Sequence, residues 1–158
     1  MKVHSTYGFN IVIALIVSTA FVMQAIAQVN QDESKMAKVK TTMKVQVTAN
    51  NKITVFELNN SQAASDLYAQ LPLSLKVENY SDYEKIFYPP KKLNTSNTPQ
   101  ADAKAGTLAY YAPWGDVVMF YGDFGSAAGL YELGHAISGG EHINKMTGTL
   151  RIEKSPEP

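Results

Sequence analysis

The sequence predicts a mainly β protein, folded as an antiparallel barrel or sandwich. Short apolar segments recur along residues 43–153, and in the clearest of them hydrophobic and polar side chains alternate. Turns rich in glycine or proline separate the segments, and only two short stretches have helical spacing. A parallel α/β sheet would need longer helices between successive strands, so the pattern favours an all-β fold.

The first predicted elements of the domain are a β-hairpin and a short helix. Residues 43–47 alternate between apolar and polar side chains, and a second strand is expected at 53–58 after a turn. The helix is expected to start at Asn60 or Ser61 and to end near Leu71, because its apolar residues have helical spacing and a proline follows.

The rest of the domain is predicted to contain short strands, loops and one more helix. The loop at 94–104 is polar and is expected to be exposed, whereas 122–129 is glycine-rich. A second helix is expected at 138–146, with Ile143 and Met146 facing the core. The remaining strands are expected at 73–77, 106–112, 117–121, 130–136 and 149–153, and residues 86–88 form a short apolar run that ends at two prolines.

The N-terminus has the features of a secretion signal. Lys2 precedes an apolar run at 11–23, and a small-x-small pattern follows at 25–27. As a helix the run would span about 20 Å, which is short for a membrane core of about 30 Å. We therefore expect a cleaved signal peptide at 1–27, with an uncleaved membrane anchor as the alternative. The mature protein is expected in the periplasm or the medium, without stable membrane insertion.

The chain after the leader divides into three predicted parts. Residues 28–40 are polar and show no periodicity, which is typical of a flexible linker. The folded domain is expected at 41–154, and a disordered tail at 155–158. We see no internal repeat, and we expect a monomer.

The composition excludes several classes of function. Loss of Lys2 with the leader lowers the basic side chains from 14 to 13, against 14 acidic ones, so the sequence does not predict nucleic-acid binding. The chain has no cysteine, which excludes disulfides, thiolate zinc sites and cysteine nucleophiles. The domain must therefore depend on its hydrophobic core for stability.

Aromatic residues are concentrated in one part of the chain. After the leader there are 13 of them, and 11 lie within residues 80–131. Trp114 and Phe124 lie beside glycines in predicted turns, where core packing explains an aromatic ring poorly. A pocket rimmed by aromatic rings is the functional interpretation, and plain packing of core and rim is the alternative. The candidate ligand-binding residues are Tyr111, Trp114, Phe120, Tyr121 and Phe124, together with Tyr88 and Lys92.

The polar residues do not form a catalytic or metal-binding pattern. His135 and His142 are separated by seven positions without a carboxylate at ligand spacing, so no metal site is predicted. Asp116 and Asp123 flank a predicted strand, about 20 Å apart if extended, and we interpret both as turn caps. Ser126 lacks a nucleophile-elbow motif, and the phosphate-binding glycine motifs are absent, so no cofactor is expected.

Several longer blocks resemble a family of small bacterial cyclophilin-like domains. The resemblance is carried by YYAPWGDVVMFYGDFG at 110–125, EKIFYPPKKL at 84–93, LPLSL at 71–75 and GLYELG at 129–134. It extends over about residues 43–153. It implies a closed antiparallel β-barrel of about eight strands with two short capping helices.

A fainter resemblance extends to cyclophilin-type peptidyl-prolyl isomerases, through LGHAISGGEHINKM at 133–146. These enzymes need a fixed, bidentate arginine beside the prolyl amide. The one arginine of this chain is Arg151, in the last predicted strand, and the position of the isomerases' pocket histidine falls near Leu130. The resemblance therefore implies little or no isomerase activity.

The sequence thus predicts an exported binding module without a catalytic site. Its aromatic groove would take a small molecule or an extended peptide. A weak or divergent prolyl isomerase that acts on exported proteins is the enzymatic alternative. A structural partner domain without a small ligand is the third interpretation.

Overall fold

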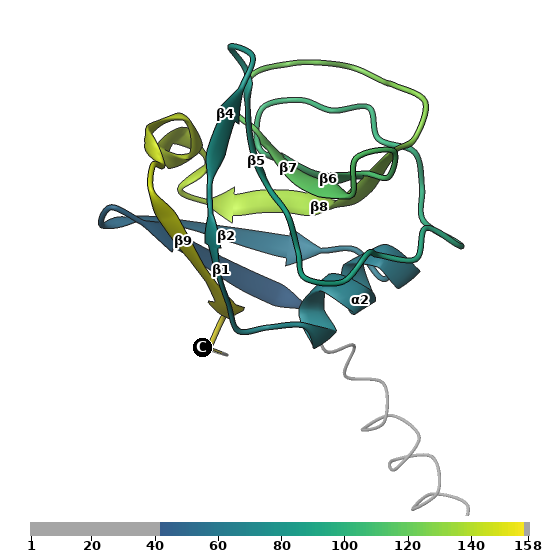
Figure 1. The fold of residues 1–158 in the computed structure, drawn as a ribbon, viewed down its shortest axis with the longest axis horizontal. Helices are drawn as coiled ribbons and strands as arrows, with labels where there is room; N and C mark the ends of the chain where they lie inside the picture. Colours follow the sequence, from purple (N-terminus) through teal and green to yellow (C-terminus); the bar gives the residue numbers. More distant parts are fainter. Residues whose placement is uncertain (1–41, 157–158) are drawn as a thin grey trace, which may run out of the picture. The chain divides into compact units, whose positions relative to one another are not determined.

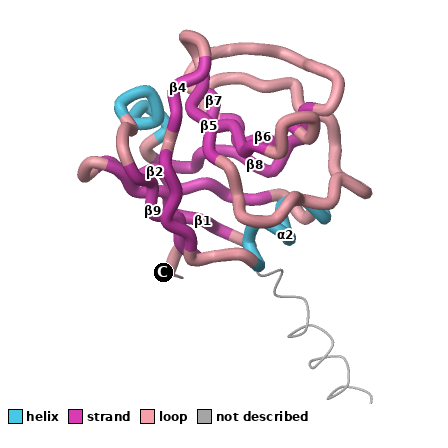
Figure 2. The backbone as a smooth tube through the Cα atoms, in the orientation of Figure 1, coloured by secondary structure: helices cyan, strands magenta, loops and turns pink. Residues whose placement is uncertain are grey.

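Nine antiparallel strands wrap into a nearly closed barrel in the computed structural model, which describes residues 42–156 (Figures 1 and 2). The mainly β barrel with two short helices that the sequence predicts is confirmed, with nine strands instead of about eight. The strands are β1 (Lys44–Ala49), β2 (Lys52–Leu58), β3 (Leu73–Lys76), β4 (Glu78–Tyr80), β5 (Glu84–Phe87), β6 (Thr107–Tyr111), β7 (Asp116–Phe120), β8 (Leu130–Ser138) and β9 (Thr149–Lys154).

The predicted leader at 1–27 and linker at 28–40 lie outside the described residues, as do positions 157–158 of the predicted tail. None of the helices in the described part of the chain is long and apolar enough to cross a membrane.

The sheet curls on itself because its two edge strands are neighbours in the chain. The hydrogen-bonded order is β3-β9-β1-β2-β8-β6-β7-β5-β4, and Val77 alone separates β3 from β4. Val77 is buried, and its amide donates to the carbonyl of Gly148 over 2.9 Å. The chain therefore passes directly from one edge strand to the other, at the point where the barrel would otherwise lie open (Figure 1).

The predicted β1–β2 hairpin is present and has a two-residue turn. Ala49 pairs with Lys52, and the intervening Asn50 and Asn51 have φ angles of 37° and 61°. Asparagine is one of the few residue types that adopts this left-handed conformation readily, so the Asn-Asn pair sets the register of the hairpin.

Two short helices flank the strands. Helix α2 (Gln62–Ala69) begins after Ser61, whose side-chain oxygen accepts from the amide of Ala64 over 3.3 Å, as predicted for an N-cap. The second predicted helix is a shorter 3₁₀ helix, η1 (Gly140–Lys145), which follows Gly139 in the left-handed conformation. Ile143 and Met146 are buried, as predicted.

The hydrophobic side chains form two clusters on opposite faces of the same strands. On β7, Val117 and Met119 belong to the large cluster that contains most of the buried hydrophobic side chains, whereas Val118 and Phe120 belong to a smaller cluster, which we call the outer cluster. All five residues of β7 are buried, because successive side chains point to opposite faces and both faces are covered.

The outer cluster is covered by loops that the sequence predicts to be exposed. Ala101 and Ala103, in the polar loop at 94–104, are both buried. Their amides donate to the carbonyls of Leu130 and Gly125 over 3.0 and 2.8 Å. The prediction is wrong at these two positions because distant hydrogen bonds hold the loop against the sheet.

Candidate functional site

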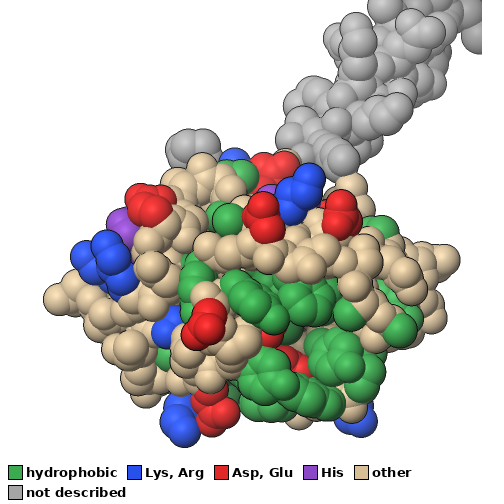
Figure 3. Space-filling view, turned by 90° about the horizontal axis from the view of Figure 1, so that it is seen from above, with side chains coloured by type: hydrophobic (Ala, Val, Ile, Leu, Met, Phe, Trp, Pro, Cys, Tyr) green, Lys and Arg blue, Asp and Glu red, His purple; other side chains and the backbone are tan. Residues whose placement is uncertain are grey.

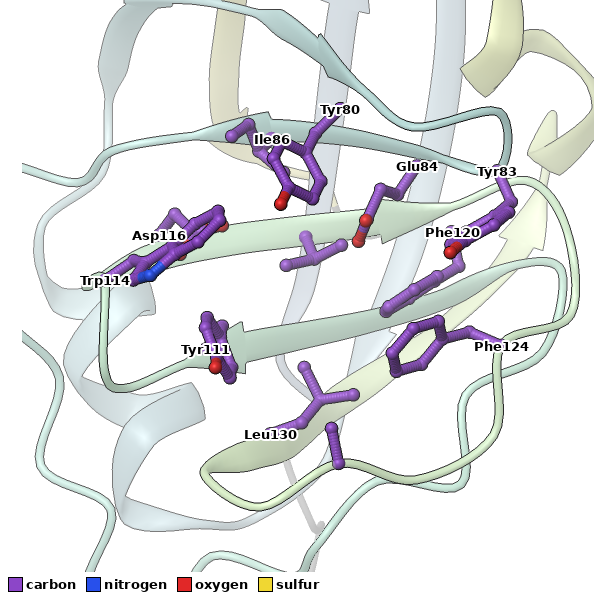
Figure 4. Close-up of a pocket in the computed structure, with 12 residues that line it drawn as sticks. Tyr80, Tyr83, Glu84, Ile86, Tyr111, Trp114, Asp116, Phe120, Phe124 and Leu130 are labelled. Atoms are coloured by element: carbon purple, nitrogen blue, oxygen red, sulfur yellow. The ribbon is translucent and has the colours of Figure 1, made fainter.

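A pocket of about 290 Å³ opens over the outer cluster (Figures 3 and 4). Figure 3 shows it as a hollow between hydrophobic side chains, with atoms of Asp or Glu side chains visible at its base. We call it the aromatic pocket. Its lining residues are Tyr80, Tyr83, Glu84, Ile86, Tyr111, Trp114, Asp116, Val118, Phe120, Phe124, Ala127 and Leu130.

Strand pairing explains which side chains form the floor of the aromatic pocket. Ile86 of β5 pairs with Val118 of β7, and Glu84 pairs with Phe120. Residues two apart on a strand share a face, so these four side chains and that of Asp116 all project to the same side of the sheet. Figure 4 shows this for Glu84, Ile86, Asp116 and Phe120.

One end of the pocket is walled by three rings, Tyr80, Tyr111 and Trp114, which we call the aromatic corner. The ring centroids of Tyr80 and Trp114 are 5.0 Å apart, with an angle of 86° between the planes. Those of Tyr111 and Trp114 are 5.5 Å apart at 78°. The rings therefore meet almost at right angles, in the edge-to-face geometry that aromatic pairs favour.

The turn between β6 and β7 presents Trp114. The amides of Trp114 and Gly115 both donate to the carbonyl of Tyr111, over 3.2 and 2.8 Å. Gly115 has a φ of 78°, which a residue with a β-carbon adopts only with strain. The amide of Ala112 donates to the carbonyl of Gly129 over 2.9 Å and fastens the turn to the neighbouring loop.

The other end of the pocket is formed by Tyr83, Phe120 and Phe124. The rings of Phe120 and Phe124 are stacked, with centroids 5.4 Å apart and planes at 28°. The centroids of Tyr83 and Phe124 are 5.7 Å apart. Phe124 is still 41% exposed, and Trp114 at the opposite end is 49% exposed, so rings at both ends leave surface free for contact with a ligand.

Two carboxylates lie in the aromatic pocket, and their pKa values are raised. Asp116 is 2% exposed, and its Oδ1 has no hydrogen-bond partner among the described residues. Burial raises the pKa of Asp116 to about 6, against a smaller lowering by its own backbone amide. Burial also raises the pKa of Glu84, which accepts a hydrogen bond from the hydroxyl of Ser81 over 3.3 Å.

Four of the seven candidate residues from the sequence meet in the aromatic pocket, namely Tyr111, Trp114, Phe120 and Phe124. Three do not line it. Tyr121 follows Phe120, so it projects from the other side of the chain, where its hydroxyl donates to Oδ1 of Asn79 over 3.3 Å. Tyr88 and Lys92 lie beyond the end of β5 and are exposed.

Sequence reasoning missed four aromatic or acidic lining residues, Tyr80, Tyr83, Glu84 and Asp116. The interpretation of Asp116 as a turn cap is wrong, because the residue is the first of β7 and its side chain is buried. The alternation in D-V-V-M-F already places Asp116 on the face of Phe120. No such signal exists for Tyr80 and Tyr83, which reach the pocket through the β4–β5 hairpin.

Among the described residues, His135, His142 and Arg151 lie outside the aromatic pocket. Nε2 of His135 is 3.1 Å from Oε1 of Glu132, and Nδ1 of His142 is 2.8 Å from the carbonyl oxygen of Ile53. Arg151 lies on β9 and pairs with Glu153 over 2.8 Å. Within residues 42–156, no three His, Asp or Glu side chains are grouped so that they could hold a metal ion.

Comparisons with known proteins agree with this architecture. A family model described as the cyclophilin-like family matches residues 47–153. Among solved structures, the solution structure of a hypothetical protein from Archaeoglobus fulgidus is similar, with a TM-score of 0.57. The two chains are 16% identical, and the similarity covers 75% of this chain and 98% of the other, so it concerns the fold alone. No curated protein matches the sequence at a significant level.

Proposed function

The chain belongs to the cyclophilin-like family, and from this premise we propose that it is an exported, non-catalytic binding module. The aromatic pocket is its binding site, and its ligand is a small molecule or a side chain of a peptide. One observation carries the proposal. Six aromatic rings from β4, β7, the end of β6 and three connecting segments converge on a single hollow, where they do not contribute to the main core.

The dimensions of the pocket favour a ligand of modest size. Ligand pockets commonly measure about 300–1,000 Å³. The aromatic pocket, at about 290 Å³, lies just below the lower limit of this range. It therefore suits an amino-acid side chain or a compact metabolite better than a dinucleotide.

The position of Arg151 supports binding over isomerisation. Strand β9 pairs with β1 and β3, whereas the pocket is built on β4, β5, β6, β7 and β8. The side chain of Arg151 is 70% exposed, so it is not held in a pocket. No lining residue of the aromatic pocket is an arginine that would stabilise a twisting prolyl amide.

Fluorescence of Trp114, the one tryptophan of the chain, tests the proposal. Titration with a panel of small aromatic and aliphatic compounds and short peptides should change its emission saturably. Phe124→Ala should weaken the affinity for an active compound by about 2- to 10-fold, because one ring contact is lost. The matched control is Ile137→Ala, which removes a side chain that is 52% exposed and does not line the pocket.

Two outcomes would contradict the proposal. The first is an emission that no compound changes saturably. The second is turnover in a protease-coupled proline-peptide assay that Phe120→Ala abolishes, since this would make the aromatic pocket an isomerase site.

A further inference from the structure

We propose that the aromatic pocket selects an organic cation. An alkylammonium group would lie in the aromatic corner of Tyr80, Tyr111 and Trp114 beside Asp116, and its apolar remainder would contact Phe120 and Phe124. This inference names the ligand class of the proposed binding site and therefore rests on the proposed function.

The first observation is the buried carboxylate of Asp116. Its side chain is almost completely removed from solvent, and Oδ1 accepts no hydrogen bond among the described residues. A buried acceptor without a donor costs about 1–3 kcal/mol, and more when it is charged. Asp116 also forms no ion pair with any Lys or Arg in residues 42–156. A ligand that brings positive charge into the pocket would supply the missing partner.

The second observation is the ring geometry beside this carboxylate. Trp114 meets Tyr80 at 86° and Tyr111 at 78°, so the rings form walls with different orientations. The face of an aromatic ring attracts a cation within about 6 Å of its centroid, most strongly for tryptophan. A carboxylate beside the rings adds charge pairing to this attraction, so the two features together favour an ammonium group over a neutral ligand of the same shape.

The third observation is the sign of the charge around the pocket. Two of its lining residues, Glu84 and Asp116, are acidic, and no lining residue is basic. Glu84 pairs with Phe120, four residues beyond Asp116 on β7, which places the two acidic positions about 13 Å apart along the sheet. The charge disfavours carboxylate and phosphate ligands and favours a cation at either end.

A direct test compares choline with 3,3-dimethyl-1-butanol, its neutral carbon isostere, by Trp114 fluorescence and calorimetry at pH 8. Asp116 has a pKa of about 6, so it is ionised under these conditions. We expect choline to bind at least about 10-fold more tightly than the alcohol. N-acetyl-lysine amide, compared with the norleucine analogue, tests whether a peptide side chain is also a source of the cation.

Two variants test the inference independently, because one removes the buried charge and the other removes an aromatic ring. Asp116→Asn should reduce the preference for choline to less than about 3-fold while the alcohol binds as before. Asp102→Asn is the matched control, because Asp102 is exposed and does not line the pocket. Tyr80→Leu removes one wall without a change in charge, and it should weaken choline more than the alcohol, even if Asp116→Asn fails to fold.

The outcomes separate the inference from the proposed function. If the neutral partner binds as tightly as its cation in both pairs, the cation inference is overturned and the binding function stands. If no compound of either kind binds, and the wider panel also fails, both are overturned. A preference for either cation that depends on Asp116 and Tyr80 supports the inference.

Discussion

Two aspartates at the ends of one strand have opposite environments. Asp123 is exposed, and its Oδ1 accepts from the amide of Ala105 over 3.0 Å. Asp116 is buried among aromatic rings, and its pKa is raised to about 6. The sequence places both beside glycines, so residue type and the adjacent glycine do not distinguish them. The difference arises because Asp116 lies within the sheet, where the pleat directs it into the pocket.

The raised pKa predicts how the stability of the ligand-free protein depends on pH. The pKa of Asp116 is higher in the folded state than the value of about 3.9 in an unfolded chain, so ionisation destabilises the fold. The cost is fully present above about pH 6 and disappears as the pH falls from about 6 to about 4. Asp116→Asn should therefore raise the free energy of unfolding by about 1–2 kcal/mol at pH 8, with no gain at pH 4.

Urea unfolding at pH 4, 6 and 8 measures this effect as a difference between variant and wild type. Glu84, whose pKa is also raised, titrates in both proteins and largely cancels. Asp123→Asn serves as the control and should give no stabilisation, since Asp123 is exposed and hydrogen-bonded. An effect of Asp116→Asn that is the same at all three pH values would contradict the assignment of the raised pKa to this residue.

At the scale of elements, the pairing of β8 with β2 requires a glycine at position 134, because the two backbones approach each other closely there. The pairing of β8 with β6 has a register shift next to Gly134, and on the other side of the strand Gly134 pairs with Leu58 of β2. A β-carbon at Gly134 would overlap the carbonyl oxygen of Glu57 and would lie 2.8 Å from Cα of Leu58. Both neighbours are backbone atoms of β2, which cannot move without disrupting the barrel.

Gly134→Ala is therefore expected to lower the free energy of unfolding by about 3 kcal/mol or more, measured by urea denaturation. Gly148→Ala provides the matched comparison, because nothing lies within 4 Å of an added β-carbon there and φ is 78°. The control should lose only about 1–2 kcal/mol through backbone strain. Equal losses at the two positions would show that the close approach of β2 and β8 does not limit stability.

Local patterns predict those elements whose causes are local. The β1–β2 hairpin follows from alternation and the Asn-Asn turn, and α2 follows from its Ser61 cap. Strand β4 escapes prediction because Glu78, Asn79 and Tyr80 are all exposed and show no alternation. Its identity as a strand comes from pairing with β5, which is a tertiary effect.

The residues of the candidate site also divide into those that local sequence patterns indicate and those that only the tertiary structure reveals. Trp114 and Phe124 can be recognised in the sequence because large apolar residues beside turn glycines are expected to be exposed, and exposed apolar groups indicate a binding site. Tyr80 and Tyr83 do not stand out, since the rings meet Trp114 and Phe124 only after β5 has paired with β7.

At the scale of the whole molecule, the proposed export depends on the first 27 residues, which the structure does not describe. Expression of the full chain in a bacterial host with a secretion pathway should yield an extracytoplasmic protein that begins at Gln28. N-terminal sequencing and intact mass measure this directly. Ile16→Lys interrupts the apolar run, and this variant should remain unprocessed in the cytoplasm. Wild-type protein that retains Met1 in the cytoplasm would contradict the proposed export.

The two hydrophobic clusters on opposite faces of β7 also bear on how such a protein changes through evolution. Val117 and Met119 help to hold the barrel together, while Val118 and Phe120 belong to the pocket. Because different residues form the two clusters, substitutions on the outer face can alter ligand preference while the selection for folding acts mainly on the inner one. We therefore expect that exchanging a few rings of the aromatic pocket would give the barrel a different ligand while the inner cluster stays unchanged.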